Sequence, residues 1–128
     1  MPVSPSLRAR RRRRMKVIHA PAELGAAGQP VAVAIGVFDG VHRGHRHILD
    51  HLLATARADS ALAVAVTFDR HPNSVVAPDR TPPQIQTLRQ RLASLGELGL
   101  DATWLIHFDK AFSRQTGEAF VRALVAGF

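Results

Sequence analysis

The sequence has 128 residues, of which 46% are hydrophobic and 21% charged, and these values suit one globular domain with its own core. It contains no cysteine, which excludes a disulfide framework and thiolate chemistry and favours a reducing compartment. The formal net charge is +7, but six of the seventeen Lys and Arg residues lie in the first fourteen positions. The rest of the chain has eleven basic and ten acidic residues, which excludes a broadly basic nucleic-acid-binding surface.

Residues 1–14 differ in character from the rest of the chain. They combine proline, serine and arginine with almost nothing apolar, which predicts a disordered extension. One interpretation of this extension is an arm that contacts RNA or an acidic surface. We favour the other, a non-functional segment ahead of an internal start at Met15, because the block of arginines contains no aromatic residue. No apolar run approaches the roughly 20 residues of a membrane span, and the N-terminus lacks the apolar core of a secretory signal. We therefore expect a cytoplasmic protein.

From Met15 onward, apolar runs alternate with amphipathic stretches. A short apolar entry at 16–18 and a small-residue connector at 22–29 lead to the first predicted strand, 31–35. Apolar residues then recur at helical spacing as far as about Ala58. The nearly continuous apolar run 62–68 predicts a parallel strand covered on both faces. Two such strands joined by one helix form a right-handed βαβ unit.

The second half of the chain continues the alternation. Residues 69–83 hold four of the eight prolines and predict a long irregular loop, a common place for binding residues. A helix from Gln84 or Thr87 to Leu98 follows, then a strand over 102–108. The last helix is expected over 117–126, with its buried face formed by Phe120, Val121, Leu124 and Val125. The order β-α-β-loop-α-β-α predicts an α/β fold with a parallel sheet, whose ligands bind outside the carboxyl ends of the strands.

The turn between the first strand and the first helix carries the strongest functional signal, the segment GVFDGVHRGH. Gly36 and Gly40 allow a sharp turn and close approach to a ligand, while Gly44 and His45 stand where the helix should begin, with its free N–H groups pointing into the turn. His42 and His45, three residues apart, can face one point and donate hydrogen bonds to an oxyanion. The turn therefore predicts a polyphosphate held by backbone and two imidazoles.

The turn lacks the G-x-G-x-x-G run of a dinucleotide fold and the Gly-Lys pair of a P-loop. Its pattern G-x-F-D-G-x-H-x-G-H resembles the nucleotidyltransferase superfamily with the HxGH motif, and most closely the FMN adenylyltransferase module of the bifunctional riboflavin kinase/FAD synthetase family. Residues 67–72 are similar to the TFxPHP segment of that family, with Arg70 in place of a proline. Residues 87–99 and 108–121 resemble its T-L…L-G and F-D-x-x-F-S…F-V segments. The resemblance covers 15–128.

The resemblance implies a Rossmann-like nucleotidyltransferase fold and the transfer of AMP from ATP to FMN with magnesium, which yields FAD and pyrophosphate. By motif match, the residues expected to stabilise charge on the phosphoryl oxygens are His42 and His45. The residues expected at the ATP are Gly36, Val37, Phe38, Asp39, Gly40 and Gly44. The residues expected at the FMN are Phe68, His71 and Pro72. Asp39 has a second interpretation, a carboxylate that holds the turn by accepting hydrogen bonds from backbone N–H groups.

The family module continues with a G-x-D-F-x-F-G segment, an S-S-T-x-x-R segment and a riboflavin kinase domain that this sequence does not contain. We therefore expect residues 15–128 to be a partial nucleotidyltransferase domain, with weak or no activity alone. Two alternatives stay open. One is an inert or nucleotide-binding remnant without turnover, and the other is a different HxGH transferase such as a cytidylyltransferase.

Other ring side chains are expected to be structural. His47 and His51 have the spacing of a helical metal pair, but a structural zinc site needs more ligands, so both are predicted to be surface residues. His107 is predicted to lie in the core or at a strand end, and Trp104, which alternates with Ile106 on the third strand, is predicted to be a packing residue.

Overall fold

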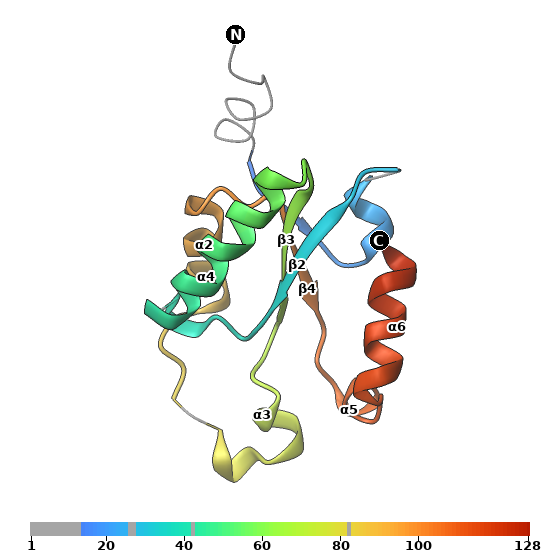
Figure 1. Cartoon of the computed structure of the whole chain (residues 1–128). Helices are drawn as coiled ribbons and strands as arrows, with labels where there is room; N and C mark the ends of the chain where they lie inside the picture. The colour runs from blue at the N-terminus through green and yellow to red at the C-terminus, as the bar shows by residue number, and fades with distance from the viewer. Residues whose placement is uncertain (1–13, 26–27, 42, 82) are drawn as a thin grey trace, which may run out of the picture.

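The computed structural model describes residues 14–25, 28–41, 43–81 and 83–128. Within these ranges four strands form one fully parallel sheet in the order β1-β4-β3-β2. The strands are β1 (Lys16–Ile18), β2 (Val31–Ile35), β3 (Leu62–Phe68) and β4 (Ala102–Ile106). Because all four run in one direction, their carboxyl ends share one edge of the sheet, the lower edge in Figure 1. The predicted α/β fold with a parallel sheet is confirmed.

Helices cover both faces of the sheet, which explains why β3 is buried along nearly its whole length. On one face lie α2 (Arg43–Ala58) and α4 (Leu88–Glu97), and on the other lie the short 3-10 helix η1 (Pro21–Leu24) and α6 (Gly117–Gly127), as Figure 1 shows. The helix α4 begins with a capping box, in which the Thr87 hydroxyl accepts from the Gln90 N–H and the Gln90 side chain accepts from the Thr87 N–H.

The alternation of side chains along β3 divides the core into two parts. Ala63 and Ala65 face α2 and α4, whereas Val64 faces η1 and α6. The first part is the larger, and its buried members are Phe38, Leu49, Leu52, Ala56, Ala61, Ala63, Ala65, Leu95 and Leu100. Small alanines on the central strand let the two helices approach the sheet closely, so this part of the core fixes how α2 and α4 sit against the carboxyl edge.

Two strand predictions need correction. Residues 16–18, expected only as an apolar entry, form the edge strand β1, because they pair in parallel with residues 102–104 of β4. The strand expected over 102–108 ends at Ile106. It is shorter because the backbone N–H of Phe108 leaves the strand direction and donates to the side chain of Asp69.

The segment 69–83, expected to be irregular, contains a helical turn, α3 (Asn73–Val76), and a 3-10 turn, η3 (Pro78–Arg80). Proline stands at the start of each of these turns, where its fixed φ favours helical geometry and its missing N–H is no loss. A further helical turn, α5 (Lys110–Ser113), was not expected; it forms because the Asp109 carboxylate accepts from the N–H of Phe112.

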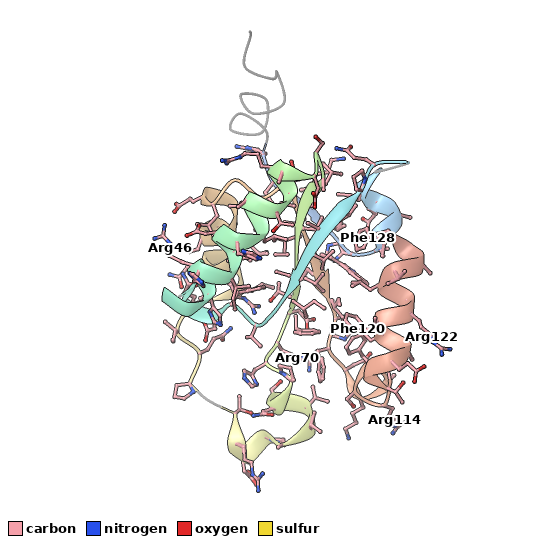
Figure 2. All side chains as sticks on the ribbon, in the orientation of Figure 1. Arg46, Arg70, Arg114, Phe120, Arg122 and Phe128 are labelled. Atoms are coloured by element: carbon pink, nitrogen blue, oxygen red, sulfur yellow. The ribbon has the colours of Figure 1, made fainter. Side chains whose placement is uncertain are left out.

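The predicted buried face of the last helix is partly wrong. Val121 is 52% exposed and Val125 is 72% exposed. Phe120 of α6 and Phe128, which follows the helix, lie on the side that faces the sheet, and Arg122 points away from it (Figure 2). Trp104 of β4 stacks on Phe120, with 6.2 Å between ring centroids, and meets Phe128 edge-on.

Among the described residues, no helix is long and apolar enough to span a membrane. The predicted extension 1–14 lies outside the described residues except for Arg14, and the predicted domain boundary at Met15 stays a prediction.

Candidate functional site

A pocket of about 190 Å³ opens at the carboxyl edge of the sheet. Its walls come from the turn after β2, the segment after β3 and the helix α4. The described residues that line it are Val37, Asp39, Asp69, Arg70, His71, Ser74, Thr81, Gln84 and Arg91. Pockets for whole small-molecule ligands usually measure roughly 300–1,000 Å³. This pocket is therefore smaller than a typical site for a whole small-molecule ligand.

The turn after β2 adopts the tight conformation that its glycines predict. Gly40 has a φ of 78°, and a Cβ there would come within 3.1 Å of the Ile85 side chain. Gly36 is required for a different reason: a Cβ there would lie 2.9 Å from the ring of Phe38. Phe38 is 1% exposed and has a φ of 57°, an unfavourable value for an aromatic residue. The turn is thus built over a buried ring and holds one strained residue.

Asp39 ties this turn to the segment before α4. Its two carboxylate oxygens accept from the backbone N–H groups of Ile85 and Gln86, each at 2.8 Å. The Gln86 side chain in turn accepts from the Gly40 N–H at 3.1 Å. Burial raises the pKa of Asp39, but these two backbone N–H bonds, with the charges of Arg91 and His71, together hold it below its ordinary value. The carboxylate does bind backbone N–H groups, although its partners lie 46 and 47 residues further along the chain; its role towards ATP stays a prediction.

Arg91 of α4 lies beneath the pocket and is 2% exposed. Its Nη1 donates to the Val37 carbonyl at 2.7 Å, and its Nη2 donates to the Phe68 carbonyl at 2.6 Å. The Thr67 hydroxyl also donates to the Val37 carbonyl, at 2.9 Å. Burial lowers the pKa of the guanidinium, while the carboxylates of Asp39 and Asp69 oppose that shift. The group nevertheless stays a cation, since arginine is not deprotonated in proteins.

The segment after β3 is hydrogen-bonded to the residues that follow β4. The Asp69 carboxylate accepts from the Phe108 N–H at 2.9 Å and pairs with Nδ1 of the His107 ring. Burial raises the pKa of Asp69, but the Phe108 and His107 hydrogen bonds and the charges of His107 and Arg70 hold it below its ordinary value. His107 is at a strand end, as one of the two predictions had it, and it is not in the core, since its side chain is 61% exposed.

Of the residues expected at the FMN, His71 is among the described residues that line this pocket, whereas Phe68 and Pro72 are not. His71 lines the pocket described above, and its Nδ1 accepts from the Asn73 N–H at 3.0 Å, so a neutral ring carries its proton on Nε2. Phe68 points to the other face of the sheet, where its ring meets those of Phe108 and Phe112. Pro72 begins the helical turn α3. Their predicted roles at FMN stay predictions.

Of the two motif histidines, the structure describes one. His45 lies in the first turn of α2, half-buried, with its ring edge-to-face against Phe38 at 5.4 Å between centroids. Gly44 is the second residue of the same helix. His42 lies outside the described residues. His47 and His51, predicted to be surface residues, are both exposed on α2.

Reasoning from the sequence missed Arg91 and Thr67, as well as the backbone of 85–86. Arg91 alone left a readable signal. It stands three residues after Leu88 and four before Leu95, so a charged side chain occupies the apolar stripe of an amphipathic helix. A cation at a core-facing position needs buried partners, and here they are the carbonyls of the two loops that line the pocket.

Comparisons with known proteins identify relatives over most of the chain. A family model described as FAD synthetase matches residues 25–128. The bifunctional riboflavin kinase/FMN adenylyltransferase of Escherichia coli (strain K12) is 35% identical over 112 residues, which cover 87% of this chain and 36% of that protein. A putative bifunctional riboflavin kinase/FMN adenylyltransferase of Geobacillus thermodenitrificans is also 35% identical over 112 residues, covering 88% of this chain and 60% of that protein. The chain therefore spans only part of the length of these relatives.

A solved structure has the same fold. The macrolide-efflux protein from Streptococcus pneumoniae superimposes with a TM-score of 0.69 at 24% sequence identity, over 88% of this chain and 38% of that one. At this identity the likeness supports the arrangement of strands and helices alone.

Proposed function

The chain belongs to the FAD synthetase family, and from that premise we propose that it transfers an adenylyl group from ATP to FMN. An oxygen of the FMN phosphate attacks the α-phosphorus of ATP, the bond from that phosphorus to the pyrophosphate breaks, and the products are FAD and pyrophosphate. The attacking phosphate monoester has a second pKa near 6, so it is largely ionised at neutral pH and needs no general base. Catalysis is then mainly the positioning of two anions and the neutralisation of their charge.

The observation that carries this proposal is the place of the glycine turn. It ends β2 and opens the sixteen-residue helix α2, whose N-terminal N–H groups and dipole favour a phosphate at the carboxyl edge of the sheet. The tight conformation at Gly40 and the small volume at Gly36 let backbone approach the phosphates closely. We propose that this turn holds the phosphates of ATP and that His45 donates to the phosphoryl oxygens, together with His42.

The FMN side of the proposal rests on the segment after β3. His71 lines the pocket with Nε2 free to carry the proton, which suits a donor to a phosphate oxygen. Phe68 offers an aromatic ring on the opposite face of the sheet. We propose that His71 contacts the FMN phosphate near the site of attack, while Phe68 and Pro72 shape the surface for the flavin.

The absence of cysteine from the sequence supports a reducing, cytoplasmic setting for this reaction.

Magnesium enters this proposal as part of the ATP substrate. Among the described residues, no three His, Asp or Glu side chains gather into a metal site. The two carboxylates of the pocket, Asp39 and Asp69, already accept N–H hydrogen bonds on both oxygens. Mg²⁺ keeps several waters and commonly binds through substrate phosphates. We therefore propose that the ion is held by the phosphates of ATP, and that the chain binds the complex through its turn and imidazoles.

The test is to incubate the full chain with ATP, magnesium and FMN and to separate the flavins by chromatography. We compare the wild type with His45→Ala and with His47→Ala, a matched control because His47 is exposed on the same helix two residues away. The proposal predicts FAD in the wild type and in His47→Ala, and a rate at least about 100-fold lower in His45→Ala, as is typical when one donor to a transition-state oxyanion is removed.

Two other results identify the alternatives. Bound ATP without FAD, measured by calorimetry, would point to a nucleotide-binding remnant without turnover. Consumption of CTP in preference to ATP would point to a cytidylyltransferase. The single tryptophan, Trp104, gives an independent measure of flavin binding, since its emission overlaps flavin absorption and a flavin bound within the domain would quench it.

A further inference from the structure

Arg91 connects the two loops that meet at the pocket. One nitrogen of its guanidinium bonds the Val37 carbonyl, which belongs to the turn after β2, and the other bonds the Phe68 carbonyl, at the end of β3. The planar fork of an arginine fixes the directions of both bonds at once, which lysine cannot do. The relative position of the two loops is therefore set by one side chain from a third element, α4.

Core packing does not explain a cation at this position. Leu88 and Leu95 occupy the same stripe of α4 one turn to either side, and an apolar side chain at position 91 would avoid the cost of burying a charge. The described hydrogen bonds of Arg91 go to the oxygens of Val37, Thr67 and Phe68, none of which carries a charge. Burying this cation therefore costs free energy, and its hydrogen bonds fix the positions of two carbonyl groups.

The Val37 carbonyl is the one whose placement matters most for the turn. It accepts from both Arg91 and the Thr67 hydroxyl, which occupies both of its lone pairs. Because the peptide bond is planar and trans, fixing this oxygen also fixes the direction of the following Phe38 N–H, which points the opposite way. Phe38 is the residue with the unfavourable φ of 57°. Arg91 therefore holds the strained part of the turn in place from below.

The charge of Arg91 also balances its surroundings. Asp39 and Asp69 both line the pocket, and both interact electrostatically with the guanidinium. Without the cation, two carboxylates would face an incoming polyphosphate, and Arg70 and His71 would be the basic side chains left among the described residues that line the pocket.

We propose that Arg91 is a positioning residue for adenylyl transfer, which fixes the turn after β2 and the end of β3 in the geometry that ATP and FMN require. This inference rests on the proposed function. It does not place Arg91 in contact with a substrate.

The test uses the full chain with Arg91→Lys, which keeps the charge but not the fork, and Arg91→Met, which removes both. The matched controls are Arg89→Lys and Arg89→Met, since Arg89 is exposed on the same turn of α4. For each variant we measure the urea midpoint, the dissociation constant for ATP with magnesium by calorimetry and, where FAD forms, kcat and KM for both substrates.

We expect Arg91→Lys to unfold close to the wild type yet to lose about 10- to 100-fold in ATP affinity or in kcat, the loss that small misplacements of reacting groups produce. Arg91→Met should lose more, and both Arg89 variants should match the wild type. The inference is overturned if Arg91→Lys keeps wild-type affinity and kcat, or if its loss equals the fraction of chain unfolded. If the wild type binds ATP but forms no FAD, the proposed function fails, and the ATP affinity of Arg91→Lys still decides this inference. A wild-type chain that binds no ATP overturns both.

Discussion

Replacing Asp39 with asparagine separates the two interpretations of this carboxylate. In the structure both of its oxygens accept backbone N–H bonds, from Ile85 and Gln86. Asparagine keeps one acceptor oxygen and presents its NH₂ group to the other N–H, so one bond becomes neutral and one is lost. Hydrogen bonds to charged groups contribute about 1.5–3 kcal/mol each. Because the Ile85 bond is exposed, we take a value at the low end and expect a loss of about 2 kcal/mol in the free energy of unfolding.

The measurement is urea unfolding at neutral pH, with Asp50→Asn as the control because Asp50 is exposed on α2. With an m value of about 2 kcal/mol/M, the midpoint of Asp39→Asn should fall by about 1 M. The thermal midpoint should fall by roughly 6–10 °C. Asp50→Asn should unfold with the wild type.

The pH dependence gives a second check. The folded pKa of Asp39 lies below its ordinary value of 3.8, so its contribution to stability is fully present above that pH and is lost as the pH falls through the folded pKa. The difference between wild type and Asp39→Asn should therefore be constant from neutral pH down to about pH 5, and should shrink below the ordinary pKa. The reasoning is refuted if the two proteins share one urea midpoint at neutral pH while the variant loses more than about tenfold in ATP affinity, because that is the behaviour of a ligand contact.

Two further predictions concern packing. Gly36→Ala drives a Cβ into the ring of Phe38 and should cost about 1–3 kcal/mol in the free energy of unfolding measured in urea. Gly96→Ala, inside α4, should be neutral or stabilising, because a Cβ there would make an ordinary contact with the Met15 side chain at 3.9 Å. Equal midpoints for the two variants would contradict the packing described for the turn. Val125→Lys, at a position 72% exposed, should change the free energy of unfolding by less than about 0.5 kcal/mol, while Leu124→Lys, at a half-buried position, should destabilise clearly. A larger loss in the free energy of unfolding for Val125→Lys would indicate that Val125 is buried, as the sequence predicted.

The sequence determined those features that depend on a few neighbouring residues. The apolar run 62–68 specifies β3, which is buried along nearly its whole length, and the run 31–35 specifies β2, an edge strand whose residues are half-buried or exposed. Both strands begin and end where these runs predict. Gly40 specifies a tight turn because glycine adopts positive φ values such as its 78° without steric cost. The helical period placed α2 and α4 to within a few residues. Local conformation and local burial were enough for each of these.

The tertiary structure decided which residues meet at the carboxyl edge. Asp39 bonds backbone 46 and 47 residues away, and Arg91 reaches a carbonyl 54 residues before it. Such pairs depend on how the parallel strands are paired and on how α4 docks against them, and no local period encodes that arrangement. The same reason explains the last helix: its period allows several apolar faces, and contact with Trp104 and the sheet selects the one with Phe120 and Phe128. The sequence by itself thus located the glycine turn after β2, whereas only the packing of distant elements revealed what holds that turn in place.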